Sequence, residues 1–224
     1  MSSFRSAKTS LKSVLNTVQQ RAHWLSLASR QSEKPVPIYP AKSPEGIKVH
    51  IGSGAINVQG WINIDARAFA HTHIVATDFD LAMFTDGAIS HIYLCHVLEH
   101  FPYSEVDSIL RNFFRKLAPD GKVYISVPDF SRLVDVFQEN KGDLNIIKSA
   151  LMGGQDYAYN FHKAMFTEQT LTKVLEATGF AEIKTWDTKD LFGAEVGDWS
   201  SRTLPTPHGA RFISLNLCAT KVGP

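Results

Sequence analysis

Lys48-Val49-His50-Ile51-Gly52-Ser53-Gly54 joins an apolar run, of the kind found in buried β-strands, to two glycines one residue apart. Glycine adopts turn conformations without steric cost and lets a ligand approach the backbone closely. Such a stretch is typical of the first strand and ligand loop of an open α/β sheet. Two glycines in a turn can also be only a turn, so the sequence on either side of them has to decide.

Further strand-like runs follow, and each of them ends in a polar residue. In an open parallel sheet, ligands lie beyond the carboxyl ends of the strands, where the strand order reverses. We therefore expect the polar endings to share one edge of the sheet and to build one site there. The runs and their endings are Trp61–Ile64 with Asp65, His73–Thr77 with Asp78, His91–Cys95 with His96, and Lys122–Val127 with Pro128-Asp129.

Helical patterns alternate with these runs. Residues 104–117 carry apolar residues at helical intervals, and Ser104 and Asp107 have the spacing of a capping box. A second helix is expected over residues 167–179. This alternation predicts an α/β fold with a doubly wound sheet. The last two strands are expected over Ile183–Trp186 and Arg211–Ala219.

Asp65 follows Gly52 by only 13 residues. An acid at the end of a second strand can accept hydrogen bonds from ribose hydroxyls. The dinucleotide fingerprint needs a third glycine, where this chain has Asn57, and an acid about 20 residues after the first glycine. A diphosphate would therefore lose the helix N-terminus on which it normally lies, whereas a cofactor with a ribose and no phosphate would lose little.

At this point the sequence resembles the class I S-adenosylmethionine-dependent methyltransferases, and in particular the small enzymes associated with bacterial surface-polysaccharide pathways. The resemblance spans about residues 47–221 and implies a seven-stranded, mostly parallel sheet whose final strand is antiparallel. It implies S-adenosylmethionine as the cofactor. The strings that carry it are His50–Gly54, Gly60–Asp65, His96–Phe101, Leu117–Gly121, Ile125–Phe130, Tyr159–Lys163, Asp198–Arg202 and Ile213–Leu217.

The resemblance also implies roles for individual residues. Two positions depart from the family pattern, since His50 replaces the usual acid of the first strand and Ile56 occupies the third glycine position. The implied roles are Gly52, Ser53 and Gly54 in the cofactor loop, Asp65 at the ribose, Asp78 with Phe79 beside the adenine, and His96 at the methionine end.

Methyl transfer to a hydroxyl requires that the acceptor be aligned and that its proton be removed. A histidine with a pKa near 6.5 suits proton removal at neutral pH. His96 and His162 are the candidate bases, and Asp129 is the candidate acid that orients one of them or the acceptor.

Residues 151–166 mix glycines, aromatic residues and polar residues without a clean period. We interpret them as the irregular part of a substrate lid that covers about residues 131–166. Tyr159 could stack on a sugar ring, while Asn160 and Lys163 could bind its hydroxyls. The alternative is an ordinary packed loop whose aromatic residues complete the core.

His96-Val97-Leu98-Glu99-His100 also fits the H-x-x-E-H pattern of zinc peptidases, in which two histidines on one helix bind zinc. Pro102 leaves little room for such a helix, and no third ligand is apparent in the sequence. We therefore expect no metal site, and a zinc hydrolase is the least favoured function.

The N-terminal residues differ from the rest of the chain. Residues 1–30 form a basic, amphipathic helical pattern, residues 31–46 form a proline-rich linker, and residues 47–224 form the methyltransferase domain. The charge over residues 1–48 is +6, which suits an anionic membrane surface, a protein partner or a targeting role. We expect a cytoplasmic protein or one attached to the inner face of the membrane.

The favoured function is O-methylation of a glycan or glycan precursor by an S-adenosylmethionine-dependent enzyme. The alternatives are a nicotinamide-dependent oxidoreductase and a non-catalytic nucleoside-binding module that recruits a partner. A net charge of +1 gives no footprint for nucleic acid, which we do not expect as a partner.

Overall fold

The computed structural model describes residues 46–77, 79–194 and 196–223. The expected N-terminal helix, all of the expected linker except Gly46, and Asp78 lie outside these residues. Within the described ranges, no helix is both long and apolar enough to cross a membrane.

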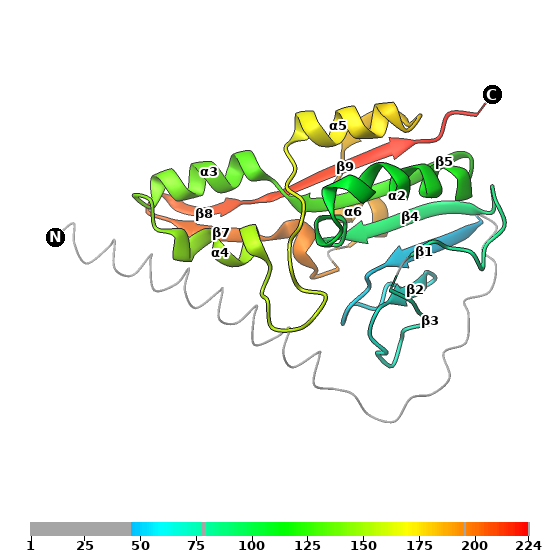
Figure 1. Cartoon of the computed structure of the whole chain (residues 1–224), viewed down its shortest axis with the longest axis horizontal. Helices are drawn as coiled ribbons and strands as arrows, with labels where there is room; N and C mark the ends of the chain where they lie inside the picture. Colours follow the sequence, from blue (N-terminus) through cyan, green and yellow to red (C-terminus); the bar gives the residue numbers. More distant parts are fainter. Residues whose placement is uncertain (1–45, 78, 195, 224) are drawn as a thin grey trace.

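The central sheet has seven strands in the order β3-β2-β1-β4-β5-β9-β6 (Figure 1). The first five strands pair in parallel, and β9 runs antiparallel to both of its neighbours. The predicted seven-stranded, mostly parallel sheet with an antiparallel final strand is therefore confirmed. The strands are β1 (Ile47–Ile51), β2 (Ile62–Asp65), β3 (Ile74–Val75), β4 (Ile89–Cys95), β5 (Leu117–Pro128), β6 (Ala181–Thr185) and β9 (Ser214–Thr220).

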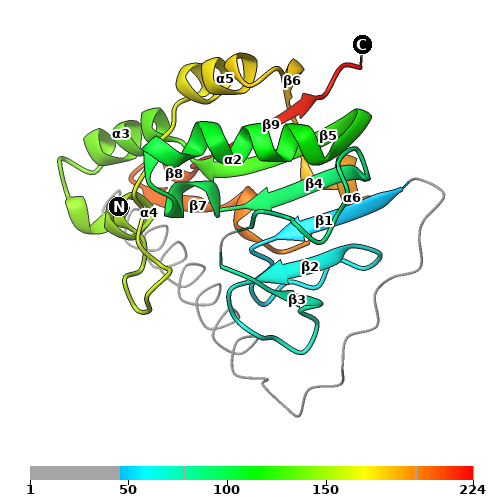
Figure 2. The ribbon, with the colours of Figure 1, turned by 45° about the vertical axis from the view of Figure 1, so that its right-hand side comes forward.

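Helices cover both faces of this sheet. Figures 1 and 2 show α2 (Tyr103–Lys116) and α5 (Glu168–Ala177) on one face and the short α6 (Thr188–Phe192) on the other. The alternate side chains of strand β4 point to opposite faces of the sheet, and they belong to two different apolar clusters. Ile92 belongs to the main core, together with residues of α2 and α5, whereas Tyr93 packs with Phe192 of α6.

A smaller unit extends from the end of β5 (Figure 1). Its own apolar cluster includes Leu133, Val136, Ile147 and Leu204. The expected lid over residues 131–166 contains two helices of this unit, followed by an irregular segment. The elements are α3 (Phe130–Glu139), α4 (Leu144–Met152), the hairpin of β7 (Thr203–Thr206) and β8 (Gly209–Phe212), and the 3₁₀ turns η1 (Leu98–His100) and η2 (Trp199–Ser201).

Two local predictions were wrong. Helix α2 has Pro102 as its N-cap and no side-chain cap, and Asp107 pairs with Arg111 at 2.7 Å instead of forming a capping box with Ser104. The expected strand over residues 211–219 is two strands that break at Ile213, whose backbone N–H donates to Arg202. By contrast, the N-terminus of α5 carries the capping box of Thr167 and Thr170, as helix start signals predict.

Candidate functional site

Asp65 ends β2 beside the glycine loop that follows β1. Its carboxylate accepts hydrogen bonds from the backbone N–H of Gly54 (2.7 Å) and of Arg67 (2.8 Å), and the residue is only 6% exposed. Each carboxylate oxygen has more than one acceptor site. Asp65 can therefore hold the loop and still accept hydrogen bonds from a ligand, as predicted for a ribose acid.

The glycine loop is pressed against the end of β4. Gly52 has a φ of +64°, and a Cβ at this position would lie 2.3 Å from Cγ2 of Val97. Ser53 donates its backbone N–H to Ile64, while its buried hydroxyl has no hydrogen-bond partner within the described part of the chain. A polar ligand that lies against the backbone of this loop could form the hydrogen bond that the Ser53 hydroxyl lacks.

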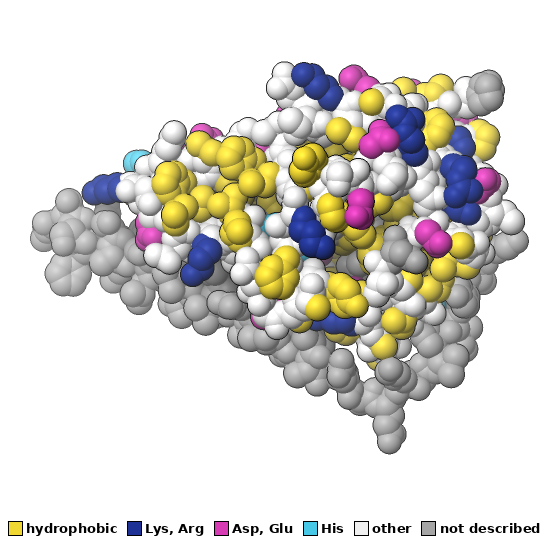
Figure 3. All heavy atoms as spheres, in the orientation of Figure 1, with side chains coloured by type: hydrophobic (Ala, Val, Ile, Leu, Met, Phe, Trp, Pro, Cys, Tyr) yellow, Lys and Arg dark blue, Asp and Glu magenta, His cyan; other side chains and the backbone are white. Residues whose placement is uncertain are grey.

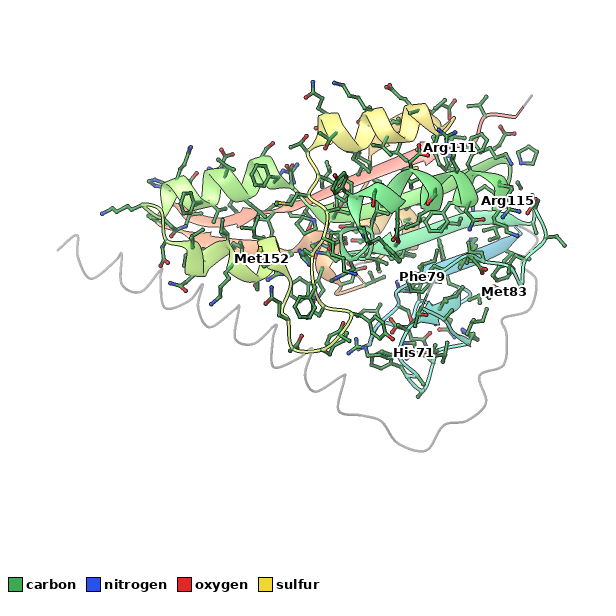
Figure 4. All side chains as sticks on the ribbon, viewed as in Figure 1. His71, Phe79, Met83, Arg111, Arg115 and Met152 are labelled. Carbon is green, nitrogen blue, oxygen red and sulfur yellow. The ribbon has the colours of Figure 1, made fainter. Side chains whose placement is uncertain are left out.

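The irregular segment of residues 153–163, here called the lid loop, reaches the same edge. Tyr157 packs against the Arg67 guanidinium, 4.3 Å from the ring centroid, and Phe69 packs against it at 4.8 Å. Figure 4 labels Met152, the last residue of α4, which directly precedes the lid loop. The loop thus extends from the end of α4 to the neighbourhood of Asp65.

Phe79, which the resemblance places beside the adenine, lies between β3 and β4 in the chain. It is buried, has a φ of +48°, and meets Phe101 edge to face at 5.9 Å. Figure 4 shows Phe79 between α2 and the β1–β3 edge of the sheet. Its predicted partner Asp78 lies outside the described residues.

His50, which occupies the position of the usual acid, is buried at the end of β1. Its Nδ1 lies 3.2 Å from the Asn63 side chain, and its ring lies 4.9 Å from that of Tyr93. Burial lowers the pKa of His50 to about 4, so the ring is neutral at pH 7. The negative charge near His50 comes instead from Asp198, which accepts a hydrogen bond from the Tyr93 hydroxyl. Sequence reasoning had given Asp198 no role.

We expect this burial to make stability depend on pH. Below pH 6.5 the unfolded chain protonates His50, whereas the native state resists protonation until about pH 4. The free energy of unfolding should therefore fall by about 2 kcal/mol between pH 7 and pH 5 on account of this residue. Urea unfolding at both pH values should show a smaller fall for His50→Gln and an unchanged fall for His208→Gln, whose residue is exposed. An unchanged fall for His50→Gln would contradict this assignment.

A second group of side chains lies at the end of β4. His96 has a φ of +54°, and its backbone N–H donates to Ser126. Its Nε2 lies 3.0 Å from Oγ of Ser214, and its Nδ1 lies 3.4 Å from Oε1 of Glu99. Nε2 of His162 lies 3.8 Å from the same carboxylate oxygen. The structure thus brings the two candidate bases to the same carboxyl oxygen of Glu99, a residue that sequence reasoning considered only within the H-x-x-E-H pattern.

Glu99 is 1% exposed, and its backbone carbonyl accepts the N–H groups of Lys163 (2.7 Å) and Ala164 (3.1 Å). These bonds attach the end of the lid loop to η1. Burial raises the pKa of Glu99 to about 8, lowers that of His162 to about 4 and lowers that of His96 well below its usual value. The two imidazoles are therefore neutral at physiological pH.

The remaining predicted residues are the candidate orienting acid and the three candidate substrate-binding residues. Asp129 caps α3 by accepting the N–H of Ser131 (3.0 Å) and pairs with Arg132 at 3.1 Å, so its carboxylate serves the helix that follows β5. Tyr159 is 51% exposed on the lid loop. Asn160 donates from its side chain to Asp156 at 2.5 Å, and Lys163 is exposed.

Gly153 begins the lid loop, and we expect it to tolerate no side chain. Its φ is +80°, and a Cβ would lie 2.4 Å from the backbone oxygen of Asn160 and 3.1 Å from Cδ2 of His162. Gly153→Ala should therefore displace the lid loop and lower turnover by at least about tenfold, because small misplacements near the reacting groups are costly.

Gly142→Ala is the matched control for this measurement. Gly142 has a φ of +82°, but its Cβ would come no closer than 3.5 Å to the Phe137 ring. The two variants share the backbone strain of alanine at positive φ and differ in the clash. Equal turnover in both variants would show that the lid loop does not position reacting groups.

The family model described as a methyltransferase domain matches residues 20–185 of the chain. No curated protein sequence matches it. Among solved structures, a chain of the complex between the Haloferax volcanii Trm112 methyltransferase activator and a methyltransferase is 14% identical, with a TM-score of 0.51, over 93% of this chain and 94% of that one. That likeness shows a shared fold.

Two further structures are similar at TM-scores of 0.49. One is a SAM-dependent methyltransferase from Archaeoglobus fulgidus, 14% identical over 79% of this chain and 87% of that one. The other is 1,6-didemethyltoxoflavin-N1-methyltransferase from Burkholderia thailandensis with bound 1,6-didemethyltoxoflavin and S-adenosylhomocysteine, 15% identical over 99% of this chain and 87% of that one.

Proposed function

Since the chain belongs to the methyltransferase-domain family, we propose that this S-adenosylmethionine-dependent methyltransferase acts on a hydroxyl group of a glycan or glycan precursor. The family assigns methyl transfer to the site, in place of hydride transfer or partner recruitment alone. The acceptor class is inferred from the side chains around Glu99 and the lid loop.

The residues around the glycine loop fit the cofactor. Gly52, Ser53, Gly54 and Asp65 would hold its ribose and methionine portions, and Phe79 would lie beside its adenine. The unsatisfied Ser53 hydroxyl and the remaining acceptor sites of Asp65 support this assignment. When bound, S-adenosylmethionine supplies a methyl group on a positively charged sulfur.

The observation that carries the acceptor class is the pairing of exposed aromatic rings with a buried, neutral proton acceptor. Tyr159 is 51% exposed and Phe161 is 40% exposed, and Phe161 directly precedes His162 in the chain. Aromatic rings of this kind can stack on the apolar face of a sugar, while Asn160 and Lys163 would bind its hydroxyls. More exposed hydrophobic side chains gather over α3 and α4 on this side of the molecule (Figure 3).

His96 is the better placed of the two candidate bases. The Ser214 hydroxyl donates its only hydrogen to the Trp199 carbonyl at 2.7 Å, so it must accept from Nε2 of His96 at 3.0 Å. This fixes the tautomer and leaves the lone pair of Nδ1 on the side of Glu99. Nδ1 of His96 can therefore take the proton of an acceptor hydroxyl, and His162 lies near the same oxygen of Glu99.

The test is a methyl-transfer screen with the full chain and S-adenosylmethionine labelled in its methyl group. Neutral glycans, acidic glycans and their nucleotide-linked precursors form one panel, and small amines and carboxylic acids form the other. We expect label in an ether that resists base. Label only in amines or in base-labile esters would overturn the glycan proposal and leave the cofactor assignment standing.

We also propose that residues 1–30 attach this cytoplasmic enzyme to an anionic membrane surface, which their basic, amphipathic pattern supports. Deleting residues 1–46 should abolish binding to anionic vesicles and leave cofactor affinity unchanged. Co-sedimentation with anionic and neutral vesicles measures this. Equal binding by both forms of the protein, or binding that does not depend on vesicle charge, would contradict the proposal.

A further inference from the structure

The group at the end of β4 brings several potential metal-ligand atoms together. One potential ligand atom from each of Glu99, His100 and His162 lies within 4.8 Å of the other two. Nδ1 of His96 faces the same carboxylate. Which of these atoms can bind a metal ion depends on where the imidazole protons are.

The hydrogen-bond partners fix where the imidazole protons are. Nδ1 of His100 lies 3.2 Å from the backbone oxygen of Phe161, which can only accept, so this nitrogen carries the proton and Nε2 keeps a lone pair. The His162 ring is likewise bonded to the backbone at Ala150 and Leu151, while its Nε2 faces Glu99. The proton of His100 therefore points to the lid loop, and Nε2 of His162 points to Glu99.

Glu99 is the least satisfied member of this group. Neither of its carboxylate oxygens has a hydrogen-bond partner among the described residues. Its closest polar neighbours are Nδ1 of His96 at 3.4 Å and Nε2 of His162 at 3.8 Å, which are lone-pair atoms when the rings are neutral. A buried carboxyl group without a hydrogen-bond partner is unfavourable, and a cation bound between it and the imidazoles would displace its proton and satisfy its oxygens.

We propose that Glu99, His100 and His162 bind a divalent transition-metal ion. Two imidazoles and a carboxylate form a ligand set for Zn²⁺ and related ions, and three protein ligands leave a position open. The backbone carbonyls that hold the histidine rings are the outer partners that metal-binding histidines usually have. Ligand atoms around a tetrahedral Zn²⁺ are roughly 3.4 Å apart, which is close to the 3.8 Å between Glu99 and His162.

This site differs from the H-x-x-E-H arrangement of zinc peptidases. His96 lies before η1 at a positive φ, so it does not share a helix with His100. The third ligand is His162 of the lid loop. If the proposed function holds, the open position would bind the acceptor oxygen, lower the pKa of its hydroxyl and leave His96 to take the proton.

The experiment uses the full chain, stripped of metal with a chelator and titrated with ZnCl₂ or CoCl₂. We expect one equivalent bound per chain, with visible Co²⁺ absorption bands of nitrogen and oxygen coordination. Glu99→Gln and His162→Gln should each weaken Zn²⁺ binding by at least about 10–100-fold, since even the loss of an outer partner costs that much. His208→Gln, which changes an exposed histidine in the β7–β8 turn, should bind like the wild type.

Titration with S-adenosylhomocysteine separates this proposal from the proposed function, because it reports the cofactor site without metal. A wild-type chain that binds S-adenosylhomocysteine but no stoichiometric Zn²⁺ or Co²⁺ would overturn the metal site and leave the methyltransferase assignment standing. Unchanged Zn²⁺ affinity in folded His162→Gln would also overturn it, even if Glu99→Gln fails to fold.

Discussion

Replacing Asp65 by asparagine is expected to weaken S-adenosylhomocysteine binding by at least tenfold, with the domain still folded. The carboxylate is positioned by the N–H groups of Gly54 and Arg67, and its remaining acceptor sites would receive the two ribose hydroxyls. Each hydrogen bond to a charged group contributes about 1.5–3 kcal/mol. Isothermal titration calorimetry measures the loss directly.

Asp80→Asn is the matched control for this variant. Asp80 also accepts the N–H of the residue two positions on, Ala82 at 2.8 Å, but it is exposed. Both variants lose one charge and weaken one turn of the same kind. Equal affinities for Asp65→Asn and Asp80→Asn would remove Asp65 from the cofactor site.

The second large effect is expected at His96. His96→Asn removes the candidate base, and asparagine tolerates the positive φ of this position better than most residues. General base catalysis contributes about 10²–10⁴-fold, so turnover should fall by more than tenfold while S-adenosylhomocysteine affinity changes little. Single-turnover methyl transfer to the acceptor found by the screen is the measurement.

His208→Asn controls for the loss of a histidine at an exposed site. A parallel fall in cofactor affinity and turnover in His96→Asn would show that His96 holds the cofactor, as its place at the methionine end also allows. Turnover at the wild-type rate would mean that alignment alone suffices, and His96 would then have a structural role.

The sequence predicted those parts of the fold that depend on local pattern. The strand-like runs that end in Asp65 and His96 correctly placed these two residues at the same edge of the sheet, because parallel strands have their carboxyl ends at one edge. The capping box at Thr167 was predictable because both partners lie within one turn. Asp107 failed as a capping residue because the helix begins at Tyr103, so Ser104 lies inside it and Asp107 pairs with its i+4 neighbour Arg111 instead.

Only part of the candidate site could be predicted, because the rest depends on contacts between residues that are distant in the chain. Glu99 and His162 are 63 residues apart in the chain, and nothing local indicates that η1 and the lid loop are joined. The sequence showed that His50 replaces the usual acid of the first strand. It could not show that the negative charge near His50 comes from Asp198, which is far along the chain. Asp129 had the right position at a strand end, but the start of α3 uses its carboxylate.

The two attachments of the lid loop have a consequence for the order of events in turnover. One end is bonded to the Glu99 carbonyl, whereas the Tyr157 side chain contacts the sheet edge through its stacking on Arg67. If the cofactor binds at Asp65 as proposed, the lid loop would open at this weaker contact before either ligand exchanged. Cofactor and acceptor then share one gate, and linkage requires that a ligand which favours the shut position tighten the hold on the other. We therefore expect S-adenosylhomocysteine to leave more slowly from an enzyme that still holds its methylated product.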